Sequence, residues 1–393
     1  IDASNVLAVT TGAGDAGSLR LEARDIAVSG GSLVDTSCDP GCTTGAGGDL
    51  TLVAGDSISI TGNDPLLPTF VVSNSFGGGR NGPISITAGG TFAMNGTALV
   101  QGIAIAGGEG STITTGFFTS AAGAGAAGGI VISTASLEVL GGAEISSSAL
   151  RGSTGGGGTV AIAASGLLRV AGTDANGKSS GIVANTFGSG QAGESDLAAD
   201  RIEIADDGRV QSQSESSGAA NAIRVRAREL ALTGRGQISS DARGGGDGGS
   251  IGIEVDGQLA IDGFDSGIFA KTYGRARGGV VRVSAGDIVV DGGGIFAGSD
   301  GAGAGGNVTV EARGSLALRN GGSIAANALS TGFAGGVSVH AGDRLTIDSG
   351  AGITTEARSA DGGDIAVTVG RLAVLDGGSI ATAVGTGQGG GGN

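Results

Sequence analysis

Several residue types that stabilise ordinary globular cores are scarce in this 393-residue chain. Tryptophan is absent, aromatic residues make up 3% of the sequence, and there are only two cysteines, four prolines and one histidine. So few rings exclude a conventional aromatic core and a stacking platform for single-stranded nucleic acid. No run of apolar residues is long enough to span a bilayer as a helix, so we expect no membrane insertion.

Positive charge is also scarce. Lys and Arg number 22 against 37 Asp and Glu, which gives a formal net charge of −15. Nucleic acids and anionic membrane surfaces attract basic proteins, so neither is expected as a partner. No signal peptide is recognisable, and we expect the chain to be processed or to be a piece of something longer.

Glycine, by contrast, is abundant, at 86 residues. The Gly-X-Y period of collagen is absent, and a hydrophobic content of 39% is too high for a disordered Gly-rich linker. Frequent Gly pairs and the lack of a sustained period of 3.6 residues also argue against helices.

The residues from Gly278 onward repeat a unit of three short apolar strands. The first strands of four successive copies lie at positions 281, 308, 337 and 365, which are 27, 29 and 28 residues apart. A second strand starts seven or eight residues later, and a third strand, such as Ser323–Ala326, follows one further step along. A period of this size indicates a solenoid, in which each copy buries its apolar side against the next.

The same unit extends over nearly the whole chain. Its twelve first strands start near Leu19, Leu50, Ile84, Ile130, Val160, Leu197, Ile223, Ile251, Val281, Val308, Val337 and Ile365. Side chains alternate across a strand, so Val281 and Val283 point inward and Arg282 points outward. We therefore predict an all-β fold: one right-handed, single-stranded parallel β-helix over residues 1–393, with about twelve coils of three short strands each. At the ~4.8 Å spacing of paired strands, twelve coils extend over roughly 60 Å.

The third strands carry a small residue at their second inward position. Examples are Ala184, Ser212, Ser240, Ala270 and Ala326, which predict a narrow corner beside this strand. In the first coil we assign Leu33 inward and Val34 outward, which makes Asp35 an unusual inward acid. Ile1–Ala3 matches a third strand, so we expect the chain to start and stop in mid-coil without caps. Either it is a segment of a longer fibre or copies associate end to end.

Cys38 and Cys42 flank the turn sequence Asp-Pro-Gly, and we predict a small local disulfide at a loop tip. The alternative is a pair of metal ligands, but a second pair and a nearby His are lacking. A disulfide points to an oxidising, extracytoplasmic setting. We predict no cofactor and no metal site, and leave open weak Ca²⁺ binding by carboxylate-rich turns.

Departures from the period mark insertions at residues 63–68, in the third coil and at residues 173–180. Insertions in repeat proteins map to loops, where binding surfaces are often found. The third-coil insertion ends near Phe117 and Phe118, which are either an exposed anchor for a partner or a pair packed under their own loop. Asn95 and Asn307 match the glycosylation tripeptide, a signal with a high false-positive rate.

The pattern from Gly306-Asn307-Val308-Thr309-Val310 to Gly322-Ser323-Ile324-Ala325 resembles the filamentous haemagglutinin-like exoproteins of two-partner secretion. The resemblance extends over all twelve coils. It implies a secreted or surface protein of a Gram-negative bacterium that acts in adhesion, aggregation and biofilm, with a glycan or matrix of a host or neighbouring cell as partner. The family's N-terminal secretion domain and Asn-Pro-Asn-Gly-type motif are missing from this sequence, as is an adhesive Arg-Gly-Asp motif.

Three other functions fit parts of the pattern. A β-helical polysaccharide-processing enzyme needs acidic and basic residues clustered on one strand face. Here His340 follows a first strand without an evident partner, and four acids recur as predicted turn residues that bond their own backbone, namely Asp25, Asp56, Asp287 and Asp343. An ice-binding solenoid needs a regular Thr ladder, and the outward third-strand positions are too mixed. A filament subunit stacked end to end remains an alternative to the function that we predict, a non-enzymatic extracellular adhesive or structural fibre segment.

Overall fold

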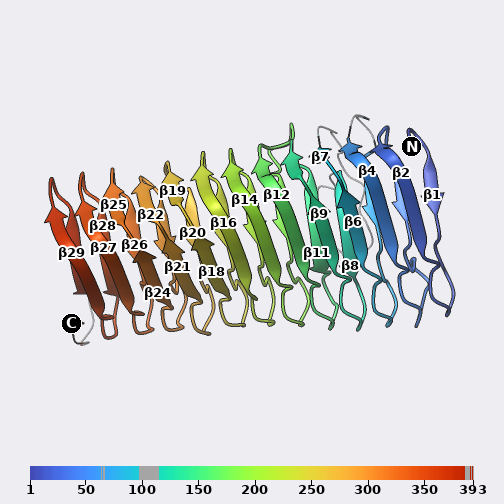
Figure 1. Ribbon diagram of the computed structural model, residues 1–393. Helices are drawn as coiled ribbons and strands as arrows, with labels where there is room; N and C mark the ends of the chain where they lie inside the picture. The colour runs from blue at the N-terminus through green and yellow to red at the C-terminus, as the bar shows by residue number, and fades with distance from the viewer. Residues whose placement is uncertain (63, 65–66, 97–114, 386–389, 391, 393) are drawn as a thin grey trace. The chain divides into compact units, whose positions relative to one another are not determined.

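The computed structural model describes residues 1–62, 64, 67–96, 115–385, 390 and 392. Of the features expected above, Asn63, Pro65, Leu66, residues 97–114 and Asn393 lie outside these residues. The described residues contain strands and turns but no helix, and the strands stack as a parallel β-solenoid of about 12 turns (Figure 1). The predicted fold class, an all-β parallel solenoid, is confirmed.

Packing divides the chain into two compact units. Unit 1 comprises Ile1–Asp200 and Asp206–Glu215, and unit 2 comprises Arg201–Ala205 and Ser216–Asn393. The strand β14 (Ser195–Ala205) contributes residues to both units. The other strands of unit 1 are β1 (Asn5–Leu7), β2 (Leu19–Val28), β3 (Leu33–Asp35), β4 (Leu50–Thr61), β5 (Phe70–Val72), β6 (Ile84–Ala88), β7 (Thr91–Asn95), β8 (Gly116–Ala121), β9 (Ile130–Thr134), β10 (Ser136–Leu140), β11 (Glu144–Ala149), β12 (Val160–Ala171), β13 (Gly181–Val183) and β15 (Arg209–Gln211).

Unit 2 contains the remaining strands of the chain. These are β16 (Ile223–Thr233), β17 (Gln237–Ser239), β18 (Ser250–Val255), β19 (Gln258–Asp262), β20 (Gly267–Phe269), β21 (Val280–Ala285), β22 (Asp287–Asp291), β23 (Gly294–Phe296), β24 (Asn307–Ala312), β25 (Ser315–Arg319), β26 (Ser323–Ala325), β27 (Val337–Ile347), β28 (Gly352–Ala357), β29 (Ile365–Val374) and β30 (Ser379–Val384). Its third strands β20, β23, β26, β28 and β30 pair in that order, each parallel to the next.

Within each unit, equivalent residues of successive coils pair directly, so that like side chains stack in columns. One column of unit 1 contains Leu50, Ile84, Ile130 and Val160, and one column of unit 2 contains Val281, Val308 and Val337. All of these side chains are buried. Removing such a side chain from water stabilises the folded chain by about 1.5–3 kcal/mol. The apolar period of the sequence therefore sets the register of the strands.

The corner between the first and second strands is built in two ways. In one coil Gly286 separates β21 from β22, whereas in another β4 runs without interruption from Leu50 to Thr61. Where one long strand covers both segments, the register can shift at the corner, as it does in β27 between Ala341 and Arg344. The sequence predicts two strands in every coil, whereas the structure has one continuous strand over both segments in β4 and β27.

The small residues after the third strand face glycines of the loop that follows. The carbonyl of Ala270 accepts a hydrogen bond from the N–H of Gly279, and the carbonyl of Ala326 accepts one from Gly335, at 3.0 and 3.1 Å. Both alanines are fully buried, and a Cβ on Gly279 would lie 2.9 Å from the Ala270 Cβ. The predicted narrow corner therefore exists because the loop returns directly against the strand end.

The predicted third strand at Ile1–Ala3 was wrong. The structure places this strand at β1, where Val6 pairs with Val34 of β3, and Asp2 instead forms a bridge with Ser29. Ile1 and Ala3 have the apolar and small side chains of a third strand, but the register is set by the pairing of Val6 with Val34.

The predicted faces of β3 were also wrong by one residue. Val34 is inward and fully buried, in register with Val71 of β5, so Leu33 and Asp35 lie on the opposite face. Because Leu33 and Val34 are both apolar, alternation alone leaves two phases possible, and a shift of one residue exchanges the faces.

Replacing Ile324 with Asp is expected to disrupt the stack in unit 2. Ile324 is fully buried between Ile295 and Ile353, so a carboxylate there would lose its hydration without gaining a partner. We expect the free energy of unfolding to fall by about 4 kcal/mol or more in chemical denaturation. The control is Ser338→Asp at an exposed outward position, expected to change it by less than about 0.5 kcal/mol. Equal losses in both variants would contradict the assignment of faces.

Candidate functional site

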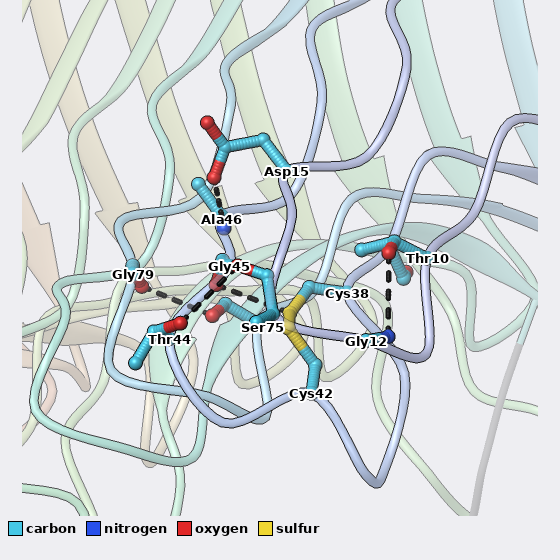
Figure 2. Close-up of a disulfide and its surroundings, with 12 residues drawn as sticks. Thr10, Gly12, Asp15, Cys38, Cys42, Thr44, Gly45, Ala46, Ser75 and Gly79 are labelled. Carbon is cyan, nitrogen blue, oxygen red and sulfur yellow. Dashed lines mark hydrogen bonds between the residues drawn. A yellow bond between two sulfur atoms is a disulfide. The ribbon is translucent and has the colours of Figure 1, made fainter.

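A disulfide joins Cys38 and Cys42 in unit 1, with Cα atoms 5.7 Å apart (Figure 2). Both residues are buried. Cys38 forms bridges with Thr10 of the preceding coil and Ser75 of the following coil, so it belongs to a stacked column and not to a loop tip. The disulfide thus ties the short loop Asp39–Gly41 to a corner of the stack.

Phe117 and Phe118 lie in strand β8. Phe117 occupies an inward position, is fully buried and packs edge-on against Phe92, with ring centroids 5.4 Å apart. Phe118 lies on the outer face and is half-buried, with its ring centroid 5.8 Å from that of Phe70. Phe117 is therefore a core residue that no partner can reach, and only Phe118 keeps an accessible surface.

The insertion at residues 173–180 is folded against its own unit. The buried carboxylate of Asp174 accepts hydrogen bonds from the backbone N–H groups of Asn176 and Lys178, at 2.9 and 2.8 Å. The Lys178 Nζ forms an ion pair of 2.8 Å with Glu144 of β11. This loop is held by polar contacts on both sides, which makes it part of the scaffold.

The acids considered as catalytic residues are dispersed. Asp35 is buried, and its carboxylate accepts the backbone N–H of Ser37 at 2.7 Å. Burial raises the pKa of Asp35 above its usual value. His340 is exposed, between Glu311 and Thr368 in the register of its sheet.

The recurring acids at the corners contact the neighbouring coil. The Asp25 carboxylate accepts the hydroxyl of Ser57, and that of Asp287 accepts the N–H of Ser315, both at 2.7 Å. Their predicted bonding to their own turn is replaced by bonding along the stack. Among the described residues, no group of three or more His, Cys, Asp or Glu could hold a metal ion, and no helix in that part of the chain is long and apolar enough to cross a membrane.

A series of polar residues, which we call the corner ladder, lies near the ends of the third strands or just beyond them. In each pair a side-chain oxygen accepts a hydrogen bond from the backbone N–H of the equivalent residue in the next coil. The pairs are Ser37–Asn74, Asn74–Ser120, Ser148–Asn185 and Asn185–Gln213 in unit 1, and Asp241–Lys271 and Asn327–Glu356 in unit 2. Each bond contributes about 1 kcal/mol, and each supplies an acceptor for a backbone N–H of the next coil.

Asp241 is the carboxylate member of the corner ladder in unit 2. It is only 5% exposed, and its carboxylate accepts the N–H of Lys271 at 2.8 Å. Burial raises the pKa of Asp241 to about 6, opposed by that hydrogen bond and by the positive charges of Lys271 and Arg243 and assisted by Asp300. The amide oxygen of Asn327 has the same role without a charge.

Next to Asp241, aromatic and charged side chains gather on the outer face of the third strands of unit 2. Phe269 and Phe296 occupy equivalent positions and stack, with ring centroids 5.5 Å apart and planes 9° apart. The Lys271 Nζ lies 5.9 and 5.7 Å from these two centroids and 4.0 Å from the carboxylate of Asp300. We call Phe269, Lys271, Phe296 and Asp300 the unit 2 cluster. It combines rings, an ammonium group and a carboxylate, which together suit a ligand with apolar, anionic and hydroxyl groups.

The corner ladder and the unit 2 cluster were missed by the sequence analysis. A signal was present for each. Asn74, Asn185 and Asn327 stand at one register position after the third strand, and Gly-Ile-Phe occurs twice, at residues 267–269 and 294–296.

Comparison of the chain with protein-family models, with curated proteins and with solved structures found no match.

Replacing Asp241 with Asn is expected to stabilise unit 2 at pH 7 and to remove a pH dependence. With a pKa near 6 when folded and 3.8 when unfolded, Asp241 keeps its proton longer in the folded state. As the pH rises from about 4 to about 6, the contribution of Asp241 to the free energy of unfolding should therefore fall by about 2–3 kcal/mol. Above pH 6 this contribution should level off. Denaturation at several pH values would measure the difference between wild type and variant, which removes the contributions of Asp35 and Asp39. A constant difference across this range would contradict the prediction.

Reducing the Cys38–Cys42 disulfide is expected to destabilise unit 1 modestly. In the chain-entropy model, a loop this short restricts the unfolded chain by about 2 kcal/mol. An alanine at position 38 fits the buried column, since Ala121 occupies it in the coil after Ser75. A Cys38→Ala, Cys42→Ala double variant should therefore fold, unfold at the lower denaturant concentration of the reduced wild type, and show no response to dithiothreitol. A response of the double variant to the reductant would rule out the disulfide as the cause.

Proposed function

We propose that this chain is a non-enzymatic structural and adhesive segment of a bacterial surface exoprotein, in which the β-solenoid acts as a stiff shaft. The observation that carries the proposal is the in-register stacking within each unit. Backbone pairing, apolar columns and the corner ladder all connect each coil to the next, so bending a unit would disturb all three at the same place.

Several features support a location outside the cell. A buried disulfide persists in oxidising compartments, and the net charge of −15 suits a soluble surface without nucleic acid or membrane as partner. The repeat resembles that of filamentous haemagglutinin-like exoproteins, which supports a two-partner secretion route and a place on the surface of a Gram-negative cell. Host or neighbouring-cell glycans or matrix would be the partners, and end-to-end association of copies would make a longer filament.

The placement of the acidic residues favours a fibre segment over a polysaccharide-processing enzyme. Asp35 and Asp241 are buried with backbone hydrogen bonds, and Asp25 and Asp287 bond to the next coil. A glycosidase needs a pair of accessible carboxyl groups facing one substrate bond. The proposal therefore involves no cofactor and no reaction.

Electron microscopy of the purified chain and a bead adhesion assay would test this function together. We expect particles on the order of 60 Å in length, from about twelve coils at ~4.8 Å, or integral multiples of that length if copies associate end to end. Beads coated with the wild-type chain should adhere to a glycan or matrix surface, and beads coated with Ile324→Asp should not. Release of sugar fragments from that surface would contradict a non-enzymatic role. Absence of adhesion on every surface would leave only the structural role.

A further inference from the structure

The corner ladder of unit 2 is interrupted at Lys271 and Gly298. Lys271 has only hydrogen-bond donors in its side chain, and Gly298 has no side chain, although both stand at ladder positions. The N–H of Gly298 and the N–H of Asn327 consequently have no acceptor among the described residues, while the ladder resumes at Asn327. N–H groups that a protein leaves without an acceptor are normally satisfied by water or by a ligand.

The ammonium group of Lys271 lies at this interruption. Its Nζ is 5.7 Å from the ring centroid of Phe296 and 4.0 Å from the carboxylate of Asp300, residues that lie two positions before and two positions after Gly298. The side chain therefore extends over Gly298, where other coils carry a ladder oxygen. A Cβ on Gly298 would lie 3.7 Å from the backbone nitrogen of Asn327, so a side chain at this position would face that N–H.

Neighbouring groups define which ligand would fit. The side-chain oxygen of Asn327 is used by the N–H of Glu356, which leaves the amide NH₂ as a further donor. The pair of Lys271 and Asp300 is formally neutral, so a bound carboxylate leaves one uncompensated negative charge there, whereas a phosphate would leave two. Phe269 and Phe296 are half-buried and add an apolar surface next to these donors.

We propose that this interruption binds a carboxylate of an acidic polysaccharide. A uronate oxygen would accept the N–H of Asn327 in place of the ladder oxygen that Gly298 lacks, as the Asp241 carboxylate accepts the N–H of Lys271 in an earlier coil. The C–H face of the sugar ring would lie against the phenyl rings, and Asp300 would accept a sugar hydroxyl. This inference rests on the proposed adhesive function and specifies its partner class. An acidic peptide offers the charge but not the hydroxyl groups.

The test measures binding of an oligogalacturonate to the full chain by isothermal titration calorimetry. Lys271→Met keeps the aliphatic stem beside the rings and removes the charge, so we expect the affinity to fall about tenfold or more. The matched control is Lys178→Met, which changes the other lysine of the chain, paired with Glu144 in unit 1, and should leave the affinity unchanged. Circular dichroism would establish that both variants keep the strand content of the wild type.

Three further ligands separate the possible sources of binding. A neutral maltooligosaccharide, poly-glutamate and sodium acetate should each bind much more weakly than the oligogalacturonate. Equal affinity for poly-glutamate or acetate would overturn the polysaccharide assignment in favour of a general carboxylate site, and equal affinity for the neutral sugar would overturn the role of charge. Unchanged affinity in Lys271→Met, or no binding by the wild type, would overturn the site itself. Bead adhesion of the wild type in that case would leave the proposed function standing.

Discussion

Parallel pairing between equivalent residues of successive coils is the interaction on which the rest of this structure depends. Because Val281 pairs with Val308, and Val308 with Val337, the inward side chains of these coils stack on one another. The same pairing aligns the polar residues of the corners, so that a side chain in one coil meets the backbone of the next. Core, corner and surface clusters are three results of one register.

Glycine and small residues make that register possible at the corners. The loop after each third strand returns so closely that Gly279 and Ala270 leave no space for an additional carbon atom. The same closeness applies at Gly298, where an added Cβ would lie 2.9 Å from the backbone carbonyl oxygen of Asn327 in the next coil. The glycine content of this chain therefore reflects backbone contact, in contrast to the flexibility expected of a Gly-rich linker.

Much of the fold was predictable because apolar periodicity reports directly on register. The coil starts, the inward columns from Val281 onward and the small corner residues all follow from it. The phase of β3 did not, because two adjacent apolar residues satisfy both alternatives, and Phe117 was placed near a loop because its coil departs from the period. The corner ladder was not predicted because an Asn or Ser after a strand is also an ordinary turn residue. A ladder residue differs from a turn residue only in the backbone N–H of the next coil that it accepts. The unit 2 cluster requires knowledge of which coils are neighbours, and the spacing of Phe269, Lys271, Phe296 and Asp300 along the chain does not reveal their proximity.

The corner ladder has a direction. In every pair the earlier coil supplies the oxygen and the later coil supplies the N–H, so a substitution that removes a ladder oxygen affects the coil that follows it and leaves the preceding one intact. A duplicated coil carries its own side-chain oxygen, which can accept the backbone N–H of the next coil. The preceding coil needs no change. Repeats built in this way can be added or lost one at a time, and their number can vary without redesign of the corner.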